Sequence, residues 1–82
     1  MVYESTKALL GSMIRLLETA DEAAWDDRLE LGSECFYEVS QMTRHSEKAK
    51  QAIPHVKLMM TAIRHRDQPT ALKNARPALA AM

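Results

Sequence analysis

The sequence predicts an all-α protein, a small antiparallel bundle of three to four helices that forms a single helical domain over residues 1–82. The 82 residues include only two Gly and three Pro, so the chain has few of the residues that turns between β-strands require. Leu, Ala and Met, which are strong helix formers, supply most of the hydrophobic residues. Apolar positions also recur at three- and four-residue steps, the period of an amphipathic helix. A chain this short buries a thin core, so a homodimer is expected.

The first predicted helix covers residues 5–20. Its apolar side chains recur every three or four residues, so they lie on one stripe of the helix, with charged residues such as Lys7 and Glu18 around them. Gly11 and Ser12 weaken the helix slightly without ending it. The apolar stripe consists of Leu9, Leu10, Met13, Ile14, Leu16 and Leu17.

A second helix is expected to begin close to residue 21. The segment Thr19-Ala20-Asp21-Glu22 fits a capping box, in which a hydroxyl residue is followed three positions later by Glu, and Asp21 is an alternative cap. The apolar stripe of this helix consists of Trp25, Leu29, Gly32, Cys35, Phe36, Val39 and Met42. Its opposite, solvated face consists of Asp26, Asp27, Glu30, Glu34 and Glu38.

The segment that follows, residues 43–53, is compatible with two arrangements. Either the second helix continues to about Ile53, or a connection intervenes and Ser46 caps a new helix. Pro54 suits a first helical turn and disrupts a helix interior, so a boundary is expected beside it. The third helix is therefore predicted over residues 54–66, and its apolar face consists of Val56, Met59, Met60 and Ile63.

A fourth, shorter helix is predicted to start at Asp67-Gln68-Pro69, which combines a capping residue with a proline suited to the first turn. Pro77 is expected to interrupt this helix, leaving the last turn as a separate segment. Short connections between the helices favour antiparallel packing of neighbours. The apolar positions of the fourth helix are Ala71, Leu72, Ala75 and Leu79.

The formal net charge is zero, but it divides into two opposite halves. Residues 1–40 carry three basic and nine acidic side chains, a net charge of −6, and residues 41–82 carry eight basic and two acidic, a net charge of +6. A neutral total argues against a free-standing nucleic-acid binder and against a polybasic protein that adsorbs to membranes. The division into an acidic and a basic half nevertheless leaves nucleic-acid binding open as an alternative function.

That alternative is a small nucleic-acid-binding or transcription-accessory protein that uses the basic C-terminal half. The cations that would reach phosphates are Arg64, His65, Arg66, Lys73 and Arg76. The aromatic residues that would stack on bases all lie in the acidic half, so nucleic acid is the less favoured partner.

No constellation of catalytic or metal-binding residues is visible. His45, His55 and His65 are ten residues apart, and ten helical residues rotate a side chain about 80° out of alignment, so the three do not share a face. Cys35 falls on an apolar stripe and is expected to be a buried thiol. The sequence therefore predicts a protein that is not an enzyme and that has no catalytic residues, cofactor or metal.

The sequence also favours a cytoplasmic protein. No basic segment followed by an apolar stretch marks a signal peptide, and no apolar run reaches the roughly 20 residues that span a bilayer. Cys35 is the single cysteine, so no intramolecular disulfide can form. We expect no membrane insertion.

The methionines indicate a protein-interaction surface. Flexible thioethers on apolar stripes can repack against different partners, and grooves that bind helices use this property. Met59 and Met60 are adjacent, and neighbours on a helix point about 100° apart, so one of them is expected near an edge or an interface. The sequence favours a module that binds an amphipathic helix of another protein.

The stretch Leu16-Leu17-Glu18-Thr19-Ala20-Asp21-Glu22-Ala23-Ala24-Trp25-Asp26 resembles the FliT-type flagellar export chaperones. In that family a first amphipathic helix ends in a short turn containing Ala, and a Trp-Asp pair opens a long acidic second helix. The resemblance covers about the first half of the chain, and Ile63-Arg64 and Leu72 are loosely similar to the later helices. This chain is shorter than members of the family, and Pro77 departs from their well-formed last helix.

The resemblance implies a chaperone or adaptor in bacterial flagellar protein export. Such a protein binds the C-terminal amphipathic segment of the filament-cap protein and contacts the export ATPase machinery or the flagellar master regulator. The groove of the family lies on its central helices. Carried over to this sequence, the implied partner-binding residues are Val56, Met59, Met60, Ile63 and Leu72.

Overall fold

A computed structural model of the chain describes residues 2–19 and 24–82, and it confirms the all-α prediction. This part of the chain forms four helices and contains no strand. Within it, no helix combines the length and the apolar character that crossing a membrane requires. The helices are α1 (Val2–Glu18), α2 (Trp25–Met42), α3 (Glu47–Arg64) and α4 (Gln68–Ala81).

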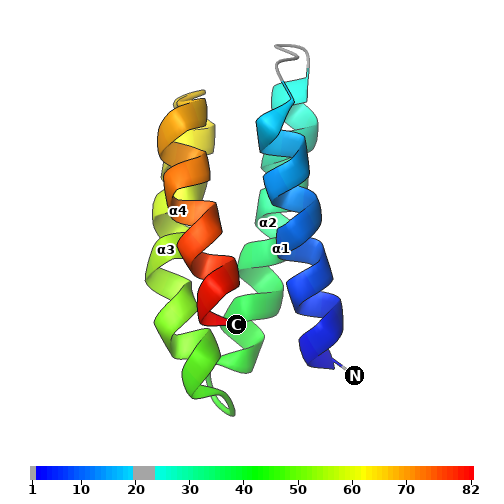
Figure 1. The fold of residues 1–82 in the computed structure, drawn as a ribbon, viewed down its shortest axis with the longest axis vertical. Helices are drawn as coiled ribbons and strands as arrows, with labels where there is room; N and C mark the ends of the chain where they lie inside the picture. The colour runs from blue at the N-terminus through cyan, green and yellow to red at the C-terminus, as the bar shows by residue number, and fades with distance from the viewer. Residues whose placement is uncertain (1, 20–23) are drawn as a thin grey trace.

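The four helices run alternately up and down along the long axis of the molecule (Figure 1). Each helix packs against the next one in sequence, and α4 also returns to pack against α1. The contact between α3 and α4 is the most extensive of these four contacts. The arrangement is therefore an antiparallel bundle made of two hairpins, α1–α2 and α3–α4.

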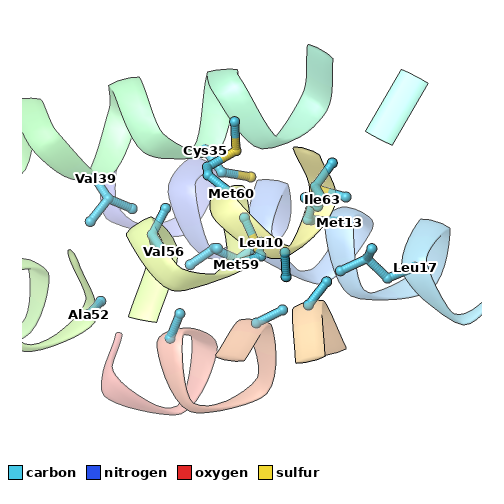
Figure 2. Close-up of a cluster of buried hydrophobic side chains, with 14 of the residues drawn as sticks. Leu10, Met13, Leu17, Cys35, Val39, Ala52, Val56, Met59, Met60 and Ile63 are labelled. Atoms are coloured by element: carbon cyan, nitrogen blue, oxygen red, sulfur yellow. The ribbon is translucent and has the colours of Figure 1, made fainter. Parts of the chain in front are cut away.

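The core lies along the axis of the bundle and receives side chains from all four helices (Figure 2). The helix α4 contributes mainly alanines, whose small side chains let its backbone approach α3 closely. Half-buried residues such as Phe36, Ile53 and Leu72 pack against the outside of this core. The buried cluster consists of Leu10, Met13, Leu17, Trp25, Cys35, Val39, Met42, Ala49, Ala52, Val56, Met59, Met60, Ala62, Ile63, Ala71, Ala75, Ala78 and Met82.

One position of the predicted apolar stripe of α2 is wrong. Leu29 is 38% exposed, and its neighbour Arg28, at 1% exposure, occupies the buried position instead. The guanidinium of Arg28 lies over the Trp25 ring, 4.4 Å from the ring centroid. Burying a charged group is favourable only where hydrogen bonds and other partners replace water, so the surroundings of Arg28 explain its place.

Arg28 donates hydrogen bonds to the C-terminal end of α1. Its Nε donates to the carbonyl of Leu16 over 3.3 Å, and its Nη2 donates to the carbonyl of Thr19. Gln68, the first residue of α4, donates its Nε2 to the carbonyl of Leu17. The last carbonyls of a helix have no partner within the helix and carry the negative end of its dipole. Side chains of α2 and α4 therefore cap α1.

The start of α2 lies later than predicted. The helix begins at Trp25, and its N-cap, Ala24, makes no side-chain hydrogen bond. Residues 20–22 of the expected capping box, which include the alternative cap Asp21, lie outside the described residues. Thr19, its first residue, donates its hydroxyl to the carbonyl of Arg15 and so belongs to the end of α1.

Of the two arrangements left open for residues 43–53, the structure shows the second. Ser46 is the N-cap of α3, and its hydroxyl accepts a hydrogen bond from the backbone N–H of Ala49 over 3.2 Å. The boundary predicted beside Pro54 is wrong, because α3 continues through it. Proline in a helix interior costs about 3 kcal/mol. The cap and the buried Ala49 and Ala52 stabilise the turns before Pro54, whose ring is exposed.

The predicted start of α4 is confirmed. Asp67 is the N-cap and accepts a hydrogen bond from the backbone N–H of Thr70 over 3.3 Å. Just before it, Arg66 has a φ of 55°, and the N–H of Asp67 bonds to the carbonyl of Ala62 over 2.8 Å. This pattern is a Schellman motif, which ends α3 and turns the chain directly into α4.

The interruption predicted at Pro77 is wrong. The helix α4 continues through Pro77 to Ala81. Ala78 is fully buried and Met82 nearly so, so the last turn is held against the core on the far side of the proline. Burial of these two residues offsets the loss of one helical hydrogen bond.

Gly32 is the point of closest approach between α2 and α3. A Cβ at this position would lie 2.6 Å from Met60 Sδ and 3.2 Å from Ile63 Cδ1. A Cβ at Gly11, in α1, would lie 3.7 Å from Arg15 Nη1, which is an ordinary contact. Only the glycine of α2 is therefore required by the packing.

We predict that Arg28→Ala lowers the free energy of unfolding by about 3 kcal/mol, because charged hydrogen bonds to buried carbonyls are lost and a cavity remains. Arg28→Lys keeps the charge but not the geometry of two donors, and should cost about half as much. Urea unfolding followed by circular dichroism measures both. Arg44→Ala, at an exposed position after α2, is the control. Equal losses at both arginines would contradict the capping role.

We also predict different outcomes for alanine at the two glycines. Gly11→Ala should raise the free energy of unfolding by about 1 kcal/mol, the gain in helix propensity. For Gly32→Ala, the same gain in helix propensity should be cancelled by about 1 kcal/mol of overpacking, since Met60 and Ile63 must move. Gly32→Val adds a larger side chain and should lower the free energy of unfolding. Urea denaturation of the three variants tests this, and equal stabilisation by both alanines would refute the close contact.

Candidate functional site

The residues predicted to bind a partner lie mostly inside the bundle. Val56, Met59, Met60 and Ile63 are all at most 3% exposed, and Leu72 is half-buried. Figure 2 shows the first four among the core side chains of the other helices. In this conformation they stabilise the fold and present no surface to another protein.

The expectation that Met59 or Met60 lies near an edge is wrong. The two side chains do diverge by about 100°, but α3 has neighbours on both sides. Met60 reaches over Gly32 of α2, and Met59 is turned toward the middle of the bundle (Figure 2). Two adjacent methionines can be buried because glycine on the facing helix leaves room for one of them.

The outer surface between α2 and α3 contains a shallow groove of about 420 Å³, which we call the α2–α3 groove. Its apolar part is formed by Phe36 of α2 and Ile53 of α3, which are both half-buried against the core. The edges carry hydroxyl groups on α2 and amines on α3. The residues that line it are Phe36, Ser40, Thr43, Lys50, Ile53 and Lys57.

The two edges of the α2–α3 groove differ in charge. On α3, Lys50 forms an exposed ion pair with Glu47 of its own helix, 3.3 Å from Nζ to Oε1. Lys57 forms no ion pair within the described residues. On α2, Thr43 donates its hydroxyl to the carbonyl of Ser40 over 2.7 Å, so this edge is polar and uncharged. The groove is therefore apolar along its floor and cationic on one side.

A second groove, of about 440 Å³, lies between α1 and α2. Leu9 and Tyr37 supply its apolar atoms, and Tyr37 is 64% exposed. Glu34 and Glu38 give this groove an acidic edge. The two grooves on either side of α2 thus have opposite charge, and the surfaces that line them are both more apolar than polar.

The sequence reasoning missed the groove residues Ser40, Lys50, Ile53 and Lys57. It assigned Phe36 to the buried stripe, whereas this side chain is half-buried. One signal was present, because Lys50 and Lys57 are seven residues apart, two helical turns on the same edge. That signal applies only if Lys50 and Lys57 belong to one helix, whereas the sequence predicts a boundary beside Pro54 and left the helix capped by Ser46 as one of two arrangements.

The other candidate chemistry is dispersed. His45 and His65 are exposed and His55 is half-buried. Across residues 2–19 and 24–82, no group of three or more His, Cys, Asp or Glu side chains is placed to hold a metal ion. Among the cations proposed for nucleic acid, Arg76 forms an exposed ion pair with Glu18, 3.2 Å from Nη2 to Oε2.

Cys35 is fully buried, as predicted. Burial raises the pKa of its thiol to about 12, and the nearby carboxylate of Glu34 acts in the same direction. A thiol with this pKa is protonated at neutral pH and is a poor nucleophile. Cys35 therefore serves as an apolar core side chain.

The chain matches no protein-family model, and no curated protein or solved structure is detectably similar to it. The resemblance to the FliT-type chaperones is neither supported nor contradicted by these comparisons. The function must therefore be argued from the groove and its chemistry.

We predict that the thiol of Cys35 makes stability fall at alkaline pH. Its pKa is raised on folding, from 9.0 to about 12. The stabilisation is thus complete below pH 9 and is lost as the pH rises toward 12. Relative to Cys35→Ala, the free energy of unfolding should fall by about 1.5 kcal/mol between pH 9 and pH 10.5. Parallel urea unfolding curves for the two proteins test this, and a constant difference would contradict it.

Proposed function

We propose that this protein is a non-catalytic interaction module that binds an amphipathic helix of another protein in the α2–α3 groove. The observation that carries the proposal is the groove itself, with an apolar floor between two antiparallel helices on the outer surface. A helix that lies along such a groove buries its apolar face against Phe36 and Ile53. The polar edges leave its other face in water.

The groove suits a helix better than a small ligand. It is shallow and open, whereas sites for small molecules enclose most of the ligand surface. The aliphatic stems of Lys50 and Lys57 extend the apolar floor along α3 while their amines stay in water. Apolar side chains spaced three and four residues apart on a partner would contact such a floor over two turns.

The proposed binding surface lies on the central helices, as the resemblance implied, but it uses different residues. The resemblance implied a groove on the central helices, with Val56, Met59, Met60 and Ile63 as its residues. In the bundle these side chains are buried in the core, and the residues of α3 that line the groove are Lys50, Ile53 and Lys57. A packed core holds the floor of the groove rigid, which lowers the entropy cost of binding.

The biological setting of the proposal comes from the FliT-like stretch. We propose an export chaperone or adaptor, with flagellar export as the specific case, that keeps an amphipathic helix of an export substrate covered before secretion. A cytoplasmic location and a homodimeric state belong to the same proposal. Sedimentation velocity tests the second of these, and a strictly monomeric protein at micromolar concentration would contradict it.

A nucleic-acid-binding function is the alternative, and the exposed cations of α3 and α4 favour it. Lys57, Arg64 and Lys73 are exposed, and none of them forms an ion pair within the described part of the chain. Against it, the aromatic residues that would stack on bases all lie in the acidic half of the sequence, residues 1–40. Binding to duplex or single-stranded DNA that weakens steeply with salt would support this alternative.

We predict that synthetic amphipathic helices bind in the α2–α3 groove. Three peptides with the same apolar face and a neutral, acidic or basic polar face are titrated into the protein and followed by calorimetry. Ile53→Ser should weaken binding of the best peptide about tenfold, since it removes half of the apolar floor. Leu58→Ser changes a leucine of α3 that is 55% exposed outside the groove, and it should have little effect.

Circular dichroism of both variants establishes that they remain folded. The proposal is refuted if none of the three peptides binds the wild-type protein. It is also refuted if the serine at position 58 weakens binding as much as the serine at position 53, because the groove would then play no special part.

A further inference from the structure

A row of three cations runs along one edge of α3. Lys50, Lys57 and Arg64 are spaced seven residues apart and all three are exposed. Seven residues advance about 10.5 Å along a helix and drift by only about 20° around it. The three side chains therefore form a nearly straight row along about four turns of α3. Lys50 and Lys57 mark this row as the edge of the α2–α3 groove.

The edge of the α2–α3 groove that faces these cations carries no charged residue. It consists of Phe36 and Ser40 of α2 and of Thr43, which directly follows α2. Nearer the other end of α3, Gly32 lies against Met60 and Ile63. The carboxylates of α2 lie further round the helix, where Glu34 and Glu38 line the opposite groove.

The cations are consequently available to a ligand. Within the described residues, Lys57 and Arg64 form no ion pair, and Lys50 pairs only with Glu47 of its own helix. The groove thus combines an apolar floor with positive charge on one side.

We propose that the occupant of the α2–α3 groove is an acidic amphipathic helix, with carboxylates at seven-residue spacing beside its apolar face. Its apolar side chains cover Phe36 and Ile53. Its carboxylates face Lys57 and the cations seven residues before and after it, Lys50 and Arg64. This inference rests on the proposed function and specifies the chemistry of the partner.

Charge complementarity at the edge of a groove selects the partner and raises the association rate more than it raises affinity. A basic amphipathic helix would bring like charges together along the row, which opposes binding. The apolar floor supplies most of the binding free energy for any helix, and the row of cations distinguishes between helices of the same shape. Binding of the acidic helix should therefore weaken as salt is added.

A second copy of this chain fits the groove less well. Its own α2 is acidic, and the exposed apolar side chains among those carboxylates are Leu29 and Tyr37. They are eight residues apart, so no pair at a three- or four-residue step is available to cover Phe36 and Ile53 together. The chain therefore matches the charge of the groove but not its apolar length, and a separate partner helix provides both.

The test compares Lys57→Glu with Lys73→Glu, which makes the same change of charge on α4, outside the groove. We expect the acidic peptide to bind the wild-type protein about tenfold more tightly than the neutral one and more tightly still than the basic one. Lys57→Glu should remove this preference and improve binding of the basic peptide. Lys73→Glu should leave the order of affinities unchanged.

Other outcomes overturn the inference in distinguishable ways. Equal binding of acidic and neutral peptides that still depends on Ile53 would leave the helix-binding function standing and refute the acidic partner. Binding of no peptide would refute both. Self-association that Lys57→Glu abolishes and Lys73→Glu does not would assign the groove to a second copy. If single-stranded DNA of equal charge competes with the acidic peptide at the same salt concentration, the row of cations on α3 would be assigned to nucleic-acid phosphates.

Discussion

The bundle depends on how the C-terminal end of α1 is capped. Arg28 of α2 and Gln68 of α4 donate to the carbonyls of Leu16, Leu17 and Thr19, at the end of α1 where helical hydrogen bonds run out. Since one donor comes from each hairpin, the same helix end joins α1–α2 to α3–α4. The cation is buried because it faces carbonyl dipoles and the ring of Trp25, which together replace its water.

Carbonyl dipoles, and not ion pairs, join the two hairpins at the end of α1. The acidic residues of positions 1–40 and the basic residues of positions 41–82 therefore remain largely on the surface. Among the described residues, Glu18–Arg76 is the ion pair that links the halves, and exposed pairs of this kind add little stability. The acidic face of α2 and the cations of α3 are thus left to act on other molecules. In the proposed function, this charge, which the fold does not neutralise internally, gives the α2–α3 groove its selectivity.

The core and the groove are two sides of the same helices. Met60 packs over Gly32, which brings α2 close to α3 and closes the interior to a partner. The same close approach leaves Phe36 and Ile53 only half covered on the outside, where they form the floor of the groove. A bulkier residue at position 32 would separate the helices and alter the core and the groove together.

Periodicity and capping chemistry in the sequence alone determined the all-α class, the burial of Cys35 and the start of α4 at Asp67. These features depend on neighbours within one or two turns. Only the tertiary structure decided the rest. Helices continue through Pro54 and Pro77 because buried residues such as Ala52 and Ala78 on either side offset a local cost of about 3 kcal/mol. Arg28 displaced Leu29 from the core because the carbonyls it caps belong to another helix, and partners so distant in sequence leave no trace in the local pattern.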